Sequence, residues 1–449
     1  MKRSIVKSHS KVCGLIAVLA FCLTAAGCAN SDESASSASQ APPASSSAAS
    51  APSSSAGSAP VNSASSSAAG AASPAPASEA PLTPASADPV QDMLDRMTLD
   101  EKLGQLVIVG LDGTSLQTET RKMIEAYKVG GFILYKPNIT SAGQTLQLLN
   151  QLKTANSSNP AALWLSTDQE GGRVSRMPES YLKIPKAAEI GKEDSPSYSR
   201  SAGQAIGEQL KSLGFNLDFA PVMDINSNPD NPVIGDRSYG ADAETVIRSG
   251  LAVLKGLQSE GIAGVVKHFP GHGDTSVDSH LELPVVDKTL EQLQAFELKP
   301  FKSAAEQGTD MIMVGHLLVP GIDPDHPASL SEKMVSGLLR GTLGYEGVVI
   351  TDDLTMGGIV KHYPIGQAAV QAILAGSDIV LVGHDTARET EVITSLKEAA
   401  VKGTLSADAI DKHVCRILKL KQKYSLSDKP LSAVSVNTVN AKVKKLLEH

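Results

Sequence analysis

Eight short apolar segments recur along the chain, and each is followed by a stretch whose apolar residues have helical spacing. The segments are continuous apolar runs rather than alternating ones, which is typical of parallel strands buried on both faces. We therefore predict strands at residues 106–109, 131–135, 163–166, 215–219, 262–266, 311–314, 348–351 and 378–382. Among the intervening stretches, we predict crossover helices at residues 142–154, 199–213, 243–259 and 290–306.

Eight alternations of strand and helix favour an α/β fold in which a (β/α)8 barrel of the TIM type forms a single catalytic domain. An open, doubly wound sheet is the alternative, although no glycine-rich dinucleotide-binding fingerprint follows the first predicted strand. We place the barrel at residues 88–425 and a C-terminal tail at residues 426–449.

Polar clusters follow six of the predicted strands. The carboxyl ends of parallel barrel strands meet at one mouth, where barrel enzymes carry their active sites. This co-location therefore predicts an enzyme. From the third strand to the eighth, the clusters are Asp168-Gln169-Glu170, Asp224 with Gly235-Asp236-Arg237, Lys267-His268, His316, Asp352-Asp353 and His384-Asp385.

The loop that follows the fifth predicted strand, residues 267–280, is unusually rich in ionisable side chains. Asp278 and His280 have the spacing of a carboxylate that holds an imidazole and stabilises its protonated form, which suits proton transfer near neutral pH. The rival interpretation is a metal site built from His268, His272, Asp274, Asp278 and His280. We predict no metal and no cofactor, because Lys267 would repel a cation and no His-x-His sequence ends an early strand.

Asp352 and Asp353 end the seventh predicted strand. Successive side chains of a strand point to opposite faces, so only one of the two is expected to point into the mouth. The other would cap the next helix or support its neighbour, and we give that role to Asp353. Strand parity alone leaves this choice open.

Two further loops, residues 168–176 and 231–238, combine acids, glycines and arginines. Such groups bind hydroxyls or carboxylates through directed hydrogen bonds, but they can equally join two loops to each other. We expect both functions. Glu170 and Arg173 would tie the loops together, and the side chains that face a ligand would be Asp168, Arg176 and Arg237.

Five segments of the chain resemble, in the same order, glycoside hydrolase family 3 and specifically its β-N-acetylglucosaminidases. They span nearly the whole folded part, and together they are far more specific than any one of them alone. The matching segments are residues 168–176, 231–238, 267–273, 278–280 and 351–356.

The resemblance implies a barrel in which Asp352 is the nucleophile, His280 the acid/base and Asp278 its partner. It further implies that the terminal sugar is bound by Asp168, Arg176, Arg237, Lys267 and His268. Many members of the family take a glutamate acid/base from a second domain. Few residues follow the eighth predicted strand here, so we expect a single-domain type with its acid/base inside the barrel.

The first 87 residues are predicted to direct export of the protein and not to form a folded domain. A basic start, a short apolar stretch and small residues before Cys28 predict a signal peptide at residues 1–27. The sequence around Cys28 resembles a bacterial lipobox, so Cys28 is the expected lipidation site; plain secretion with an unmodified cysteine is the alternative. Residues 28–87 are almost entirely Ser, Ala and Pro, which predicts a disordered linker because such a segment cannot bury a core.

The net charge and the predicted export signal limit the classes of partner and substrate that the protein can have. The formal net charge of −8 argues against nucleic acid as a partner. We expect an exported, lipid-anchored monomer whose catalytic domain lies on the extracytoplasmic side of the bacterial cell membrane. Family and address together predict removal of terminal N-acetylglucosamine from peptidoglycan fragments or chito-oligosaccharides through a covalent glycosyl-enzyme. The alternatives are a phosphorylase, another β-glycosidase, or a sugar-binding lipoprotein without catalysis.

Overall fold

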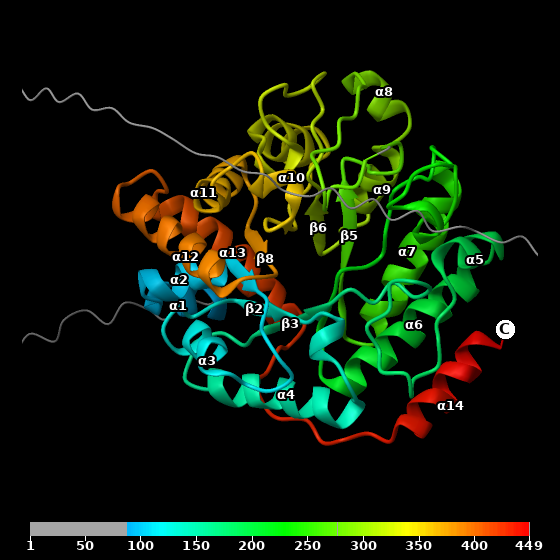
Figure 1. Ribbon diagram of the computed structural model, residues 1–449, viewed down its shortest axis with the longest axis horizontal. Coiled ribbons are helices and arrows are strands. Elements are labelled where there is room, and N and C mark those ends of the chain that lie inside the picture. Colours follow the sequence, from blue (N-terminus) through cyan, green and yellow to red (C-terminus); the bar gives the residue numbers. More distant parts are fainter. Residues whose placement is uncertain (1–87, 276, 449) are drawn as a thin grey trace, which may run out of the picture. The chain divides into compact units, whose positions relative to one another are not determined.

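The computed structural model describes residues 88–275 and 277–448. The predicted signal peptide, the lipidation site Cys28 and the linker 28–87 lie outside the described residues. Eight parallel strands form one closed barrel in sequence order, with the last strand paired to the first, and helices surround it (Figure 1). The strands are β1 (Val107–Val109), β2 (Gly131–Ile133), β3 (Trp164–Thr167), β4 (Leu217–Asp218), β5 (Ala263–Phe269), β6 (Met311–Val314), β7 (Val348–Asp353) and β8 (Ile379–Val382).

All eight predicted strands are present, and the prediction of a TIM-type α/β barrel is confirmed. The residues of β1 are fully buried, as expected for strands covered on both faces. The fifth strand is longer than predicted, because β5 continues through Lys267 and His268 to Phe269. Its last backbone groups still find partners: Met223 N donates to Lys267 O (2.6 Å), and Gly315 N donates to Phe269 O (2.9 Å).

The helices largely follow the predicted periodicity. They are α1 (Pro89–Arg96), α2 (Leu99–Gln105), α3 (Thr118–Glu125), α4 (Ala142–Asn156), α5 (Ala187–Lys192), α6 (Pro196–Leu213), α7 (Ala243–Ser259), α8 (Leu290–Ala295), α9 (Lys299–Glu306), α10 (Gly357–Val360), α11 (Ile365–Ala375), α12 (Thr386–Val401), α13 (Ala407–Lys423) and α14 (Val436–Leu447). Shorter turns are η1 (Lys136–Asn138), η2 (Gly235–Arg237) and η3 (Ala328–Leu330), and η4 (Lys333–Thr342) is π-helical.

The prediction of one helix at residues 290–306 is wrong, because this segment forms two helices, α8 and α9. Pro300 lies in the first turn of α9, where its missing amide hydrogen costs nothing. Within a continuous helix the same residue would remove a backbone hydrogen bond and clash with the preceding turn. The break therefore follows from a proline that the apolar spacing alone does not reveal.

The amino-terminal end of the barrel is closed by a side chain from α13. Lys421 is buried, and its Nζ donates to Gln105 Oε1 (2.6 Å), Gly130 O (2.9 Å) and Ala162 O (2.6 Å). These acceptors lie just before β1, β2 and β3. One ammonium group thus satisfies three oxygens at the ends of neighbouring strands.

Residues 426–448, set apart above as a tail, belong to the same compact unit as the barrel. They include α14, which packs against α6 with Val439 and Val443 buried (Figure 1). Asn440 also joins α14 to the segment before α5, because its side chain donates to Ser180 O and accepts from Leu182 N. In the described part of the chain, no helix is long and apolar enough to cross a membrane.

Candidate active site

A cavity of about 340 Å³ lies at the carboxyl ends of the barrel strands. Every predicted catalytic and sugar-binding residue except Asp278 lines it, and Asp278 contacts His280, which does. The strands and the loops that follow them thus bring together groups separated by up to 184 positions in sequence, from Asp168 to Asp352. The predicted residues in the lining are Asp168, Arg176, Arg237, Lys267, His268, His280 and Asp352.

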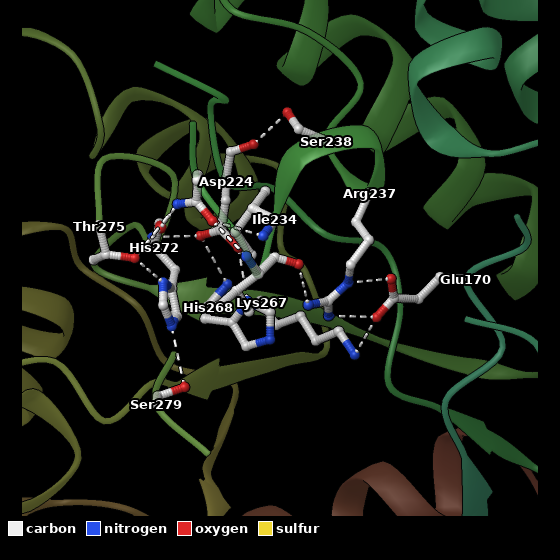
Figure 2. A network of polar contacts seen from close by, with 12 residues as sticks. Glu170, Asp224, Ile234, Arg237, Ser238, Lys267, His268, His272, Thr275 and Ser279 are labelled. Atoms are coloured by element: carbon white, nitrogen blue, oxygen red, sulfur yellow. Dashed lines mark hydrogen bonds and ion pairs between the residues drawn. The ribbon is translucent and has the colours of Figure 1, made fainter. Parts of the chain in front are cut away.

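A buried ion network forms one wall of this cavity. Lys267 Nζ lies 2.8 Å from Asp168 Oδ1 and 2.8 Å from Glu170 Oε1. Arg237 donates two parallel hydrogen bonds to the Glu170 carboxylate, at 2.8 and 2.7 Å (Figure 2). Burial alone would raise the pKa of Glu170, but these two cations hold the pKa well below its ordinary value.

Glu170 joins the two loops, as predicted, because it pairs with Arg237 of the other loop. It also lines the cavity and orients Arg237 and Lys267, a role that was not predicted. Arg173 joins the loops too, as predicted: its Nε donates to Asp236 Oδ1 (2.9 Å) and its Nη2 donates to Val233 O (2.6 Å). Sequence alone could not separate the two roles, because both loops carry acids and arginines in close succession.

Arg176 extends the same wall beside Asp168. Its Nη2 lies 3.8 Å from Asp168 Oδ2, and its backbone N donates to Gln169 Oε1 (2.8 Å). The buried Nε of Arg176 has no hydrogen-bond partner among the described residues. A buried donor without a partner costs stability, so this one is suited to a ligand oxygen in the cavity.

Asp224 is a site residue to which the sequence analysis gives no role. It is fully buried and accepts from His272 N (2.7 Å), while its Oδ2 lies 2.7 Å from His268 Nδ1 (Figure 2). Burial would raise the pKa of Asp224, but the His268 imidazole and these hydrogen bonds lower it. The available signal was an acid in the loop after a buried strand, three residues after Pro221.

His272 anchors the loop that precedes Asp278. Thr275 Oγ1 donates its own hydrogen to His272 O, so it accepts from His272 Nδ1 (2.7 Å), and His272 Nε2 can then accept from Ser279 Oγ (3.1 Å) (Figure 2). This pattern needs a neutral ring. Burial accordingly lowers the pKa of His272 to about 4.

Asp278 and His280 form the predicted pair. His280 Nδ1 lies 2.7 Å from Asp278 Oδ1, which also accepts from His280 N (2.9 Å). The His280 side chain is 64% exposed and lines the cavity, so it can exchange protons with both ligand and solvent. Burial would raise the pKa of Asp278, but the hydrogen bonds from His280 lower it.

Asp352 and Asp353 both line the cavity, contrary to the expectation that one would turn away. A register shift in the pairing of β7 with β8 accompanies this departure from strict alternation. Asp353 is a supporting group, as predicted: it accepts from Thr355 N (2.9 Å) and Gly383 N (3.0 Å), and from a tyrosine hydroxyl, Tyr135 OH (3.2 Å).

The Asp352 carboxylate is bonded much more sparsely. Among the described residues it accepts one hydrogen bond, from Asp353 N (2.8 Å). Burial would raise the pKa of Asp352, but the nearby imidazole of His268 and the hydrogen bond from Asp353 N help to lower it to about 2. The low pKa favours the ionised form of Asp352 at neutral pH, and the residue lines the cavity.

The residues weighed above as metal ligands are engaged with protein groups. His268 and His272 are bonded as described, and Asp274 pairs with Lys288 (2.6 Å). In residues 88–275 and 277–448, no group of three or more His, Cys, Asp or Glu side chains is placed to hold a metal ion. The chemistry available in the cavity is that of an ionised carboxylate, an imidazole with a carboxylate partner, and hydrogen-bonding groups suited to hydroxyls.

Comparison with known proteins agrees with this chemistry. Residues 98–420 match the Glycosyl hydrolase family 3 N terminal domain. The chain is 34% identical over 357 residues to β-hexosaminidase A of Pseudoalteromonas piscicida, a match that covers 74% of this chain but only 60% of that protein. It is 35% identical over 291 residues to a β-hexosaminidase of Idiomarina loihiensis, covering 64% of this chain and 86% of that protein.

A solved structure is similar over much the same region. The glycoside hydrolase family 3 β-N-acetylglucosaminidase of Paenibacillus sp. str. FPU-7 superimposes with a TM-score of 0.74 at 40% identity, covering 78% of this chain and 68% of that one. The barrel, the cavity and the sequence similarity lead to one conclusion. The chain is a glycoside hydrolase and belongs to family 3.

Proposed function

We propose that this glycoside hydrolase is a retaining exo-β-N-acetylglucosaminidase. It would remove terminal N-acetylglucosamine from the non-reducing ends of peptidoglycan fragments or chito-oligosaccharides. The observation that carries the proposal is that one cavity is lined by the Asp352 carboxylate and by His280, whose imidazole is held by Asp278. The choice of sugar is supported by the names of the relatives, which are β-hexosaminidases and a β-N-acetylglucosaminidase.

In the first step, an Asp352 oxygen attacks the anomeric carbon as the bond to the leaving oxygen breaks. The low pKa of Asp352 keeps the attacking group ionised at working pH. His280, as imidazolium, donates its proton to the departing oxygen, and Asp278 stabilises that protonated form. The products are a glycosyl ester on Asp352 and a neutral leaving group.

In the second step, the now neutral His280 accepts a proton from a water molecule. The resulting oxygen attacks the anomeric carbon, and Asp352 leaves as a carboxylate. Two displacements at the same carbon restore the original configuration, so the sugar is released as the β-anomer. His280 ends the cycle protonated.

The terminal sugar would be held by the other predicted residues of the cavity lining. Lys267 and Arg237 are fixed by the Glu170 carboxylate, and Asp168 and Arg176 present further hydrogen-bonding groups beside them. His268, held through Nδ1 by Asp224, keeps Nε2 for the ligand. Such fixed, charge-assisted donors and acceptors orient sugar hydroxyls with little loss of conformational entropy.

The proposal includes a location. The sequence features at residues 1–27 and at Cys28 support export and lipidation, with the barrel on the extracytoplasmic side of the bacterial membrane. There the enzyme would meet cell-wall fragments.

The test is hydrolysis of 4-nitrophenyl β-N-acetylglucosaminide by the full chain and by two variants. Asp352→Asn, which keeps the shape but removes the charge, is expected to lower kcat by at least about 10³-fold. His280→Ala is expected to lower kcat/KM on a disaccharide substrate by about 10²- to 10⁴-fold, the usual contribution of a general acid. Intact-protein mass after a rapid quench should show the glycosyl adduct in the wild type and not in Asp352→Asn.

His326→Ala is the matched control. His326 also lies beside an aspartate, Asp323 (3.7 Å), but outside the cavity, so this variant should retain wild-type kinetics. Several outcomes would contradict the proposal: no turnover, full activity in Asp352→Asn, a product released as the α-anomer, or preference for the plain β-glucoside. Formation of a sugar 1-phosphate when phosphate is added would identify a phosphorylase instead.

A further inference from the structure

The loop that carries His280 is held against the segment that follows Asp352. Gly357 N donates to His280 O (3.1 Å), and Gly358 N donates to Ser279 O (3.1 Å). Lys361, in the same segment, pairs with Glu282. The loop that carries His280 and the segment that follows Asp352 are therefore joined by backbone hydrogen bonds, although they follow different strands of the barrel.

A side chain would not fit at Gly357 without a shift of the loop, and it would be tightly packed at Gly358. A Cβ on Gly357 would lie 2.6 Å from Leu281 O and 2.7 Å from His280 O. A Cβ on Gly358 would lie 3.1 Å from Ser279 O and 3.2 Å from Glu282 O. Neither residue has a positive φ, so close approach of the loop, and not backbone conformation, requires glycine at these positions.

A buried histidine makes the surface under the glycines rigid. His316 Nε2 must donate to Asp353 O (2.9 Å), because a carbonyl oxygen can only accept, and His316 Nδ1 is then left to accept from Ser329 Oγ (2.7 Å). His316 is fully buried, and its Cβ lies 3.6 Å from the position of a Cβ on Gly358. The end of β7 and the docking surface for the loop are thus parts of one packed unit.

We infer that Gly357 and Gly358 form a clamp that sets the reach of His280 to the leaving-group oxygen. The inference rests on the proposed function, since it assigns the two glycines as positioning residues for the proposed acid/base. A general acid must lie within hydrogen-bonding reach of the oxygen that it protonates. A side chain at Gly357 would push the loop outward and lengthen that reach, while Asp352 stays on its strand.

The clamp can be tested by the dependence of the rate on the leaving group. A dinitrophenyl glycoside leaves with little protonation, whereas a disaccharide such as N,N′-diacetylchitobiose needs a proton on its departing oxygen. For Gly357→Ala we expect kcat/KM to fall about 10²-fold on the disaccharide and less than about 5-fold on the dinitrophenyl substrate. The parameter kcat/KM is the one to compare, because it reports the first irreversible step, in which the leaving group departs.

Gly143→Ala is the matched control. A Cβ on Gly143, in α4, would meet nothing within 4 Å, so this variant should keep wild-type kinetics on both substrates. His280→Ala provides the reference for full loss of the acid. An equal loss on both substrates in Gly357→Ala, or wild-type values on both, would overturn the clamp.

Misfolding of the variant and failure of the proposed function can each be distinguished from failure of the clamp. Should Gly357→Ala fail to fold by circular dichroism, Gly358→Ala carries the same test, since its Cβ would meet its neighbours at 3.1 Å or more and needs a smaller shift. If the wild type cleaves neither the dinitrophenyl N-acetylglucosaminide nor the disaccharide, the proposed function is wrong. The same ratio is then measured on the β-glycosides that the wild type does cleave.

Discussion

Glu170, Lys267 and Arg237 place three charges in the wall of the cavity with little access to water. The side chains of Glu170 and Lys267 are 5% and 2% exposed. Burying charges is costly, and a buried pair often stabilises a fold no more than apolar residues of similar volume would. The network is better understood as a device that fixes two donors toward a ligand, at some expense in stability.

This view predicts the effect of Glu170→Gln. Removing the charge leaves Arg237 and Lys267 buried with one carboxylate fewer, so the free energy of unfolding should fall by about 3 kcal/mol at pH 7. The pKa of Glu170 in the folded chain lies below its ordinary value of 4.5. The ionised carboxylate therefore contributes its full stabilisation of the folded state above pH 4.5. The difference between wild type and variant should therefore shrink as the pH falls below 4.5, as measured by urea unfolding.

Glu189→Gln is the control for this prediction. Glu189 is exposed and lies 4.0 Å from Lys186, so its loss should change stability by less than about 1 kcal/mol at any pH. Equal losses in the two variants would show that burial of the network does not matter.

The positions of some site residues could be predicted from the sequence, and those of others could not. The motifs predicted which side chains gather at the mouth, because strand order and strand ends follow from the apolar pattern. They left open which of Asp352 and Asp353 faces the cavity, since alternation is strict only in a regular strand. In the structure both line the cavity, and Asp353 is identified as the supporting group by hydrogen bonds from Gly383 and Tyr135, which follow β8 and β2 and cannot be inferred from the local sequence.

Among the elements, the strands were easier to predict than the helices. Each strand is a short buried run, whereas helix ends depend on single capping or breaking residues such as Pro300. The extension of β5 was missed because Pro270 and Gly271 suggested an earlier end. Its partners at that end, Met223 and Gly315, come from neighbouring connections in the barrel.

Helix α13 provides a test at this scale. Lys421→Met would keep the length of the side chain but leave three buried oxygens, those of Gln105, Gly130 and Ala162, without their donor. The free energy of unfolding should fall by about 3 kcal/mol in urea titrations. Lys419→Met, an exposed site on the same helix, should be nearly neutral, and a similar fall there would contradict the assignment.

For the molecule as a whole, the barrel contains the entire cavity. Its lining begins at Ile133 and ends at His384, well inside the described residues. We therefore predict that the barrel is a complete catalytic unit without residues 1–87.

A chain that starts at residue 88 is expected to unfold in a single cooperative transition and to keep kcat/KM within about 2-fold of the full chain. Calorimetry and turnover of the chromogenic substrate measure both quantities. A chain that starts at residue 107, lacking α1 and α2, is the contrast, and it should lose stability because α13 packs against both helices. Loss of turnover in the chain from residue 88 would mean that the cavity needs the N-terminal segment.

The contacts of Lys421 also bear on the order in which the molecule can be completed. Its acceptors Gln105, Gly130 and Ala162 precede it by 316, 291 and 259 residues. A polypeptide that emerges amino terminus first, from a ribosome or through a channel, exposes the first three strand ends long before their donor arrives. We therefore expect the amino-terminal end of the barrel to close only after α13 has emerged. Until then, the first three strands would lack one of the groups that stabilise their ends.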